Sequence, residues 1–337
     1  MLDERWSEDV EEIGDAIAKM LAVESAPDKV RKAEEDYGGI DPELVTRLDA
    51  FGLGELAGEP ELFARVAFEL GKALASVAFV ETMPVLALTG KAGVSLGFSG
   101  PVPAANVLVA VRDGGEVRIE RLNGPARRSA AGDSLVFHQT TGEGETIGDA
   151  GLADRLQRFA DLVDAARLVG AGQALLAYGV DYAGQREQFG KIIGTYQGVA
   201  HRLARVAGDL DAAELLVRKA AFTASPANGG DGAPPPHFAI MVRAKAIQAA
   251  RFAATNVHQV FGGNGFAMEY DVQLYSRRIR SWAMRGRRAG PDLAELGRMV
   301  LDPARRDSLT MLWHYEKGMP LPRWAREADA AGGPAAS

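Results

Sequence analysis

Apolar positions follow a helical period through most of the first 95 residues. Near the N-terminus, apolar side chains recur at intervals of three and four, on one helical face: Val10, Ile13, Ile17 and Leu21. A longer apolar stretch, residues 62–88, is predicted to be helical with an interruption near Pro84, because proline lacks the donor that an inner helical turn needs. Residues 1–95 are therefore predicted to form an N-terminal helical domain.

The pattern changes between residues 96 and 150, where apolar and polar residues alternate over short runs. Three strands are predicted, at residues 106–111, 117–122 and 134–139. Asp113-Gly114-Gly115 lies between the first two strands and is typical of a hairpin turn. Residues 142–148 are rich in glycine and are predicted to be a loop. We expect a reduced β domain, since the segment is short for a complete barrel.

The helical period returns at residue 151 and predicts a C-terminal helical bundle over residues 151–325. The proline- and glycine-rich residues 225–237 are predicted to be an irregular connection within it. Later helices are predicted at residues 238–260, 272–284 and 292–316. Residues 326–337 are predicted to be a disordered tail. The fold class is therefore predicted to be mainly α, with an N-terminal helical domain, a reduced middle β domain and a C-terminal four-helix bundle.

Composition narrows the classes of function. The 337 residues are 47% hydrophobic and 25% charged, with a net charge of -7, so the chain can bury a core and is a poor general binder of nucleic acid. There are no cysteines, which excludes disulfides and thiolate chemistry. The five histidines are scattered, so we expect no metal site. An acidic N-terminus without an apolar core, and no long apolar run, predict a cytoplasmic protein with no membrane partner.

Two motifs lie on the predicted bundle. The first is YAGQREQFGK at residues 182–191, followed by Tyr196-Gln197. The second is QVFGGNGF at residues 259–266, followed by Glu269-Tyr270. Together, in this order and at this spacing, they resemble the acyl-CoA dehydrogenase family. The resemblance is close over about residues 150–285, loose over the N-terminal helices and poor over the β segment.

The resemblance implies FAD as the cofactor and assigns these motifs to its ADP half. Arginine offers a fixed fork of donors for a pyrophosphate, an aromatic ring offers a face for adenine, and Gly-Gly lets backbone N–H groups come close. The implied cofactor-binding residues, named here the adenine clamp, are Arg186, Gln188, Phe189, Gln259, Gly262 and Gly263. In the family this clamp reaches across a subunit interface to a neighbour's flavin. Gly262–Gly265 also suits a helix end, and Glu269-Tyr270 suits a structural role.

The chain departs from the family at the catalytic base. The family's usual glutamate stands seventeen residues after the glutamate of the EY pair, and here that position is Gly286. A minority of the family places the base twenty-six residues before the clamp arginine, and here that position is Ala160. Asp161 is adjacent but lies about 100° around the helix. No catalytic residue is therefore assigned, and Asp161 and Glu269 stay as candidates for a displaced base.

Two further features bear on the flavin. The family's segment that holds the flavin ring has no counterpart, because residues 94–102 lack its glutamate and aspartate. Six arginines gather near the missing base, where they could attract phosphates or form a basic face toward an acidic partner or solvent: Arg277, Arg278, Arg280, Arg285, Arg287 and Arg288.

The presence of a clamp without a base predicts a division of labour between two chains. We expect this chain to be the subunit of an α2β2 acyl-CoA dehydrogenase that completes the FAD site of a larger partner, which supplies the base and most of the acyl-CoA site. The pattern is similar to the short subunits of actinobacterial heterotetramers that act on CoA thioesters of steroid side chains, and the family implies an electron-transfer flavoprotein as acceptor. Two alternatives stay open, a complete homo-oligomeric enzyme with a displaced base and an assembly scaffold without flavin.

Overall fold

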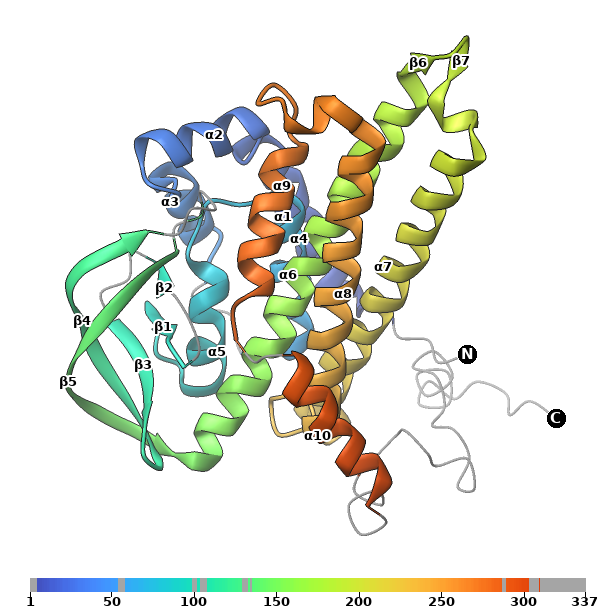
Figure 1. Ribbon diagram of the computed structural model, residues 1–337. Coiled ribbons are helices and arrows are strands. Elements are labelled where there is room, and N and C mark those ends of the chain that lie inside the picture. The colour runs from blue at the N-terminus through green and yellow to red at the C-terminus, as the bar shows by residue number, and fades with distance from the viewer. Residues whose placement is uncertain are drawn as a thin grey trace.

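The computed structural model describes residues 5–53, 58–98, 102–103, 108–128, 133, 135–286, 289–302 and 309 (Figure 1). Helices before and after one small sheet make up most of the described chain, which confirms the predicted mainly α fold class. In Figure 1 the sheet lies beside the lower half of the bundle, and the β6–β7 hairpin projects from its upper end. Among the described residues, no helix is both long enough and apolar enough to cross a membrane.

The N-terminal helices wrap around one that is almost wholly buried. The five helices are α1 (Glu8–Glu24), α2 (Pro27–Asp36), α3 (Pro42–Ala50), α4 (Pro60–Lys72) and α5 (Phe79–Thr89). Residues Pro60 to Gly71 of α4 are all buried. The helix was predicted to be interrupted at Pro84, and this position was wrong because Pro84 lies inside α5. The break comes earlier, where buried Leu74 turns the chain out of α4 with a left-handed φ of 49°.

The middle segment forms one five-stranded sheet. Its strands are β1 (Val94–Leu96), β2 (Val102–Pro103), β3 (Leu108–Asp113), β4 (Glu116–Arg128) and β5 (Leu135–Asp149), in the order β1-β3-β4-β5-β2. β1 runs parallel to β3, and the other pairs are antiparallel. Val94, Ala110 and Val117 pack against Leu152 and Leu156 at the start of the long helix that follows. This packing fixes the sheet against the bundle.

The predicted loop at residues 142–148 was wrong, since these residues belong to β5. They pair with β4 in a register that sets Gly144 opposite Glu120 and Gly148 opposite Val117. A Cβ at Gly144 would lie only 2.0 Å from the backbone oxygen of Ile119. The glycine there permits close pairing of two strands rather than a turn, which is why composition alone suggested a loop.

The C-terminal bundle is built around one helix of 36 residues. Its helices are α6 (Ala150–Gln185), α7 (Gln197–Ala224), α8 (Pro236–Phe261), α9 (Val272–Ala283) and α10 (Ala289–Leu301). Short 3₁₀ turns connect them: η2 (Ile193–Thr195), η3 (Pro226–Asn228) and η4 (Gly262–Phe266). Predicted helical residues beyond 302, and the predicted tail, lie outside the described residues apart from Leu309.

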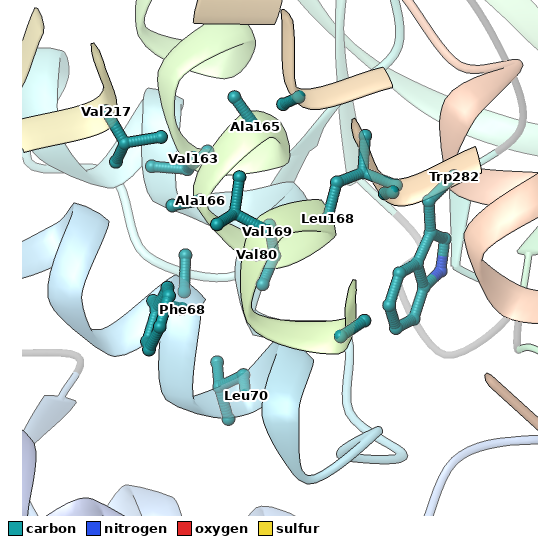
Figure 2. Packing of buried hydrophobic residues seen from close by; sticks show 14 of the residues in the cluster. Phe68, Leu70, Val80, Val163, Ala165, Ala166, Leu168, Val169, Val217 and Trp282 are labelled. Atoms are coloured by element: carbon teal, nitrogen blue, oxygen red, sulfur yellow. The ribbon is translucent and has the colours of Figure 1, made fainter. Parts of the chain in front are cut away.

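The bundle and the N-terminal helices share one hydrophobic core. A Cβ at Gly170 of α6 would lie 2.1 Å from the backbone oxygen of Phe68 in α4, and one at Gly71 would lie 2.1 Å from that of Arg167. Glycines therefore let α4 and α6 cross in backbone contact. Figure 2 shows apolar side chains of α6 at this core, with Trp282 of α9 on one side. α6 therefore connects the two regions where functional residues are expected, since Ala160 lies within this helix and the adenine clamp begins directly after it.

Candidate functional site

The first part of the adenine clamp is a short hairpin at the end of α6. Arg186 caps α6, its N–H donating to the Tyr182 oxygen at 3.0 Å. The strands β6 (Glu187–Gln188) and β7 (Lys191–Ile192) follow, with Phe189 and Gly190 between them. Both turn residues have positive φ, 54° and 82°, as a type I′ hairpin turn requires. The turn therefore projects Arg186, Gln188 and Phe189 together at the end of the bundle.

Phe189 is held in a conformation that side chains rarely adopt. A positive φ is uncommon outside glycine and disfavoured for a bulky residue. The ring is 94% exposed, so burial within the chain does not compensate. The Tyr196 hydroxyl donates to the Gln188 and Phe189 oxygens at 3.1 and 3.3 Å, and the Lys191 ammonium lies 4.1 Å from the Tyr196 ring centre. These contacts fix the hairpin and leave the phenyl face open.

The second part of the clamp lies where α8 ends. Gln259 is exposed on the last turn, and Gly262 ends the helix with φ 59° and ψ −132°, a combination open essentially to glycine alone. A Cβ at either Gly262 or Gly263 would meet no atom within 4 Å, so this stretch of backbone is open on its outer side. The backbone conformation thus explains glycine at 262, and the backbone at Gly263 is open to approach from outside.

A group of aromatic side chains brings the two parts of the clamp to the same end of the bundle. Tyr182, four residues before Arg186, stacks on Phe261 with ring centres 4.0 Å apart. Asn264 Nδ2 donates to the Tyr182 hydroxyl at 2.9 Å and to the Tyr270 hydroxyl at 3.3 Å. Tyr270 therefore has the structural role that its sequence position suggested.

A groove of about 680 Å³ runs beside Gln259 and Gly262. The predicted adenine clamp did not include the other walls of this groove, among them Phe266, Arg280 and His258. Phe266 is 85% exposed, and His258 shares a 2.6 Å hydrogen bond with the Ser276 hydroxyl. Burial, together with the Arg280 charge, lowers the pKa of His258 below its ordinary 6.5, so the ring is neutral at pH 7. This end of the bundle offers an exposed arginine, exposed aromatic faces and open backbone.

The two positions expected for a catalytic base lie together at a second place in the molecule. Ala160 of α6 and Gly286, after α9, both line one cavity between the sheet and the bundle. Its volume is about 30 Å³. A water molecule needs about 10–15 Å³ on such a measure, whereas cofactor pockets occupy about 300–1,000 Å³. The cavity as it stands therefore admits water and no flavin ring.

Charged side chains take up the space around this cavity. Three carboxylates and three guanidinium groups, none more than 8% exposed, form what we call the ion cluster: Glu81, Asp161, Asp164, Arg167, Arg243 and Arg285. Arg167 donates to Glu81 at 2.6 Å and to Asp164 at 2.5 Å, and Arg285 also donates to Glu81. Burial alone would raise the pKa of Asp164, but Arg285, Arg167 and Arg243 outweigh it and hold that pKa below its ordinary value.

The candidates for a displaced base lie in very different places. Asp161 is 1% exposed and accepts a hydrogen bond from Gln157 at 3.1 Å. Its Oδ1 lies 3.9 Å from the point where a Cβ would stand at Gly286. Glu269 is exposed in the segment between η4 and α9, at the clamp end of the molecule. Position therefore favours Asp161 over Glu269 as a displaced base.

The arginines near the missing base do not form one basic face. Arg277 and Arg278 both pair with Glu34 of α2, at 2.8 and 2.7 Å, and Arg278 is 2% exposed. Arg285 belongs to the ion cluster, and Arg280 lines the clamp-end groove. Arg287 and Arg288 lie outside the described residues. Internal pairing thus accounts for three of the four described arginines.

The residues present fit one half of FAD and not the other. The clamp end combines donors and aromatic faces that suit an ADP group, whereas the cavity at Ala160 and Gly286 is too small for an isoalloxazine ring.

Comparison with known proteins gives a consistent assignment. Residues 162–286 match the family model of the acyl-CoA dehydrogenase C-terminal domain. The chain is 26% identical to acyl-CoA dehydrogenase IpdE2 of Mycolicibacterium smegmatis over 324 residues, 87% of this chain and 98% of that protein. It is 36% identical to benzylmalonyl-CoA dehydrogenase of Aromatoleum aromaticum over 120 residues, which is 35% of this chain and 30% of that protein.

Two solved structures share the fold at 18% identity, each covering 89% of this chain and 99% of the other. One is a variant of the Tcur3481-Tcur3483 steroid ACAD, with a TM-score of 0.77. The other is the ChsE4-ChsE5 complex from Mycobacterium tuberculosis, with a TM-score of 0.76. Residues 162–286 therefore belong to the acyl-CoA dehydrogenase C-terminal domain family, whose members depend on FAD, and most of the chain shares its fold with these two solved structures.

Proposed function

We propose that this chain is the non-catalytic subunit of a heteromeric acyl-CoA dehydrogenase. It completes the FAD site of a partner, and the partner supplies the base, the flavin-ring pocket and most of the acyl-CoA site. One observation carries the proposal. The two positions at which the base was expected, Ala160 and Gly286, share one water-sized cavity whose lining carboxylates, Glu81 and Asp164, are paired with arginines.

The clamp residues have separate tasks in this proposal. The Arg186 guanidinium pairs with the pyrophosphate, while Phe189 offers its exposed face to the adenine. Gln259 and the open Gly263 backbone contact the same ADP group from α8, with Gln188 beside Arg186. Bound FAD would accept the hydride of an α,β-dehydrogenation. The residues of this chain bind and orient the remote half of the cofactor and leave proton abstraction to the partner.

The partner and substrate class rest on the structural relatives. The Tcur3481-Tcur3483 protein is a steroid ACAD, and ChsE4-ChsE5 is a complex of two named chains. By analogy we propose an α2β2 heterotetramer acting on a steroid side-chain CoA thioester. An electron-transfer flavoprotein is the acceptor that the family suggests.

The proposal is tested by co-expression with a neighbouring acyl-CoA dehydrogenase gene product. About one FAD per heterodimer, with a colourless and inactive chain when purified alone, is the expected result. Two FAD per heterodimer, or a yellow chain that oxidises an acyl-CoA alone, would show that this chain builds its own site. If substitution of the clamp residues left the flavin content of the complex unchanged, the chain would be an assembly scaffold.

A second candidate function has one observation in its favour, the position of Asp161 beside Gly286. If Asp161 were a displaced base, Asp161→Asn would abolish dehydrogenation. If the partner supplies the base, Asp161→Asn in the co-expressed complex leaves the pH profile of kcat unchanged. If a partner variant without its own base stayed active in the complex with this chain, the displaced base would be favoured.

A further inference from the structure

The segment Trp282–Gly286 stands where the family carries its base, and the ion cluster holds it there. Arg243 Nη2 donates to the Trp282 oxygen at 3.0 Å and also to the Arg285 oxygen. The Arg167 guanidinium lies 4.4 Å from the centre of the Trp282 ring, which Figure 2 shows against α6. The Arg285 side chain donates to Glu81 of α5. Backbone, ring and side chain of the segment are thus each fixed by a different charged group.

The buried charges of the cluster are paired with one another, which makes its members interdependent. Three acidic and three basic side chains meet in a space where none is more than 8% exposed. Removing one partner of a buried ion pair leaves the other charge without compensation, so such clusters resist partial opening. Movement of Arg285 away from the cavity would leave Glu81 with one guanidinium partner in place of two. The segment therefore has a strong preference for its present position.

The cluster lies in the space that a ligand of this chain would need. Glu81, Asp164 and Arg285 form one side of the cavity, and Leu96 and Phe98 approach it from the sheet. Only about 30 Å³ remains between them. A flavin ring or acyl chain, in a pocket of about 300 Å³ or more, would have to displace these charged side chains and break their pairing.

We infer that the ion cluster excludes ligand from this chain's own half-site, and so determines which chain of the pair holds the flavin ring and the acyl group. The inference rests on the proposed function and assigns a role in it to residues outside the adenine clamp. Glu81, Arg243 and Arg285 act through the segment Trp282–Gly286 and are positioning residues. Two features of this chain then make the heterodimer asymmetric: the ion cluster fills its half-site, and the chain lacks a base.

Thiol labelling tests this inference, because the chain has no cysteine of its own. Val163 lines the cavity and is 1% exposed, whereas Val23 on α1 is 65% exposed. In the co-expressed complex, iodoacetamide should label Val163→Cys at least about 100-fold more slowly than Val23→Cys, as read by mass spectrometry. Labelling of Val163→Cys within about tenfold of Val23→Cys, slowed by an added acyl-CoA, would overturn the inference.

Opening the cluster provides the second arm. Arg285→Ala, introduced into Val163→Cys, should raise the labelling rate about tenfold or more. Leu48→Cys, buried in α3 away from the cluster, serves as the control for unfolding and should stay slow. If Leu48→Cys also reacts, Glu81→Gln decides, because it keeps the side-chain volume and removes the charge that holds Arg167 and Arg285. An unchanged Val163→Cys rate in a folded variant would overturn the inference.

The labelling result is separable from the flavin count. One FAD per heterodimer with a reactive Val163→Cys would refute the role of the ion cluster and leave the proposed function intact. Two FAD per heterodimer would refute the proposed function whatever the labelling rate.

Discussion

The adenine clamp and the ion cluster both involve α6, and they differ in the exposure and pairing of their charged side chains. At the end of α6, Arg186 is exposed beside a Phe189 that has no burial to stabilise it. At the middle of α6, Asp164 and Arg167 are buried, and Arg167 pairs with both Asp164 and Glu81. The first place is exposed to solvent, while the second pairs its charged side chains with one another inside the chain. Under the proposed function, the first place is completed by a partner and the second binds no ligand.

The largest expected effect concerns the ion cluster. Glu81→Ala leaves Arg167 and Arg285 without their shared carboxylate, and we expect it to lower the free energy of unfolding by about 3–5 kcal/mol. Denaturant unfolding measures the change. The matched control is Glu145→Ala, which breaks an exposed ion pair with Lys91 and should have little measurable effect. Equal effects of the two variants would mean that the cluster does not contribute as a buried unit.

The next effect concerns cofactor retention. Arg186→Ala should weaken FAD retention by the complex by about 1.5–3 kcal/mol, because a charge-assisted bond to phosphate is lost. Unfolding of the chain should not change, since Arg186 is exposed. Flavin release after dilution measures the first quantity and thermal melting the second. Arg112→Ala, at an exposed position on β3, should leave both unchanged, and a loss of FAD in that control would contradict the assignment.

A smaller effect should separate stability from function at one residue. Phe189→Gly removes a side chain held at a φ of 54°, so the isolated chain should become more stable by about 0.5–1 kcal/mol. The same change should weaken FAD retention by about 0.5–1.5 kcal/mol, since a stacking face is lost. Opposite signs in the two measurements are the prediction. Loss of stability with unchanged retention would make Phe189 a structural residue.

The smallest effect is on the acid dependence of stability. The pKa of Asp164 is lower in the folded chain than its ordinary 3.8, so its stabilising contribution is complete above that value and is lost as pH falls through the folded pKa. Asp164→Asn should flatten the acid limb of the unfolding curve. Asp154→Asn is the control, because Asp154 is mostly exposed beside Arg158. An unaltered limb in Asp164→Asn would contradict this assignment.

Local patterns predicted the helices of the bundle well. The period of α6, α7 and α8 follows from their apolar spacing, and the glycines after Phe261 end α8 as their conformation requires. The strand at residues 142–148 was missed because its glycines serve strand pairing, which depends on a partner elsewhere in the chain. The true break after α4 depends on the backbone of Leu74, which no turn residue marks. The adenine clamp residues remain predictions.

The ion cluster could not be predicted from motifs. Its members come from α5, α6, α8 and the segment after α9, and tertiary packing alone brings them together. One signal was present in the sequence: Asp161, Asp164 and Arg167 recur at intervals of three within residues 159–172, which are otherwise apolar. Charged residues on a buried face need partners, so this spacing indicates an internal network without naming its other members.

The most direct test of the account uses photoreactive FAD analogues in the co-expressed complex. An analogue with an azide on the adenine should label this chain, in the peptide that contains Phe189 or the one that contains Gly263. An analogue with an azide on the isoalloxazine ring should label the partner. Ring-dependent labelling of the peptides that contain Ala160 or Gly286, or adenine-dependent labelling of the partner alone, would contradict the account.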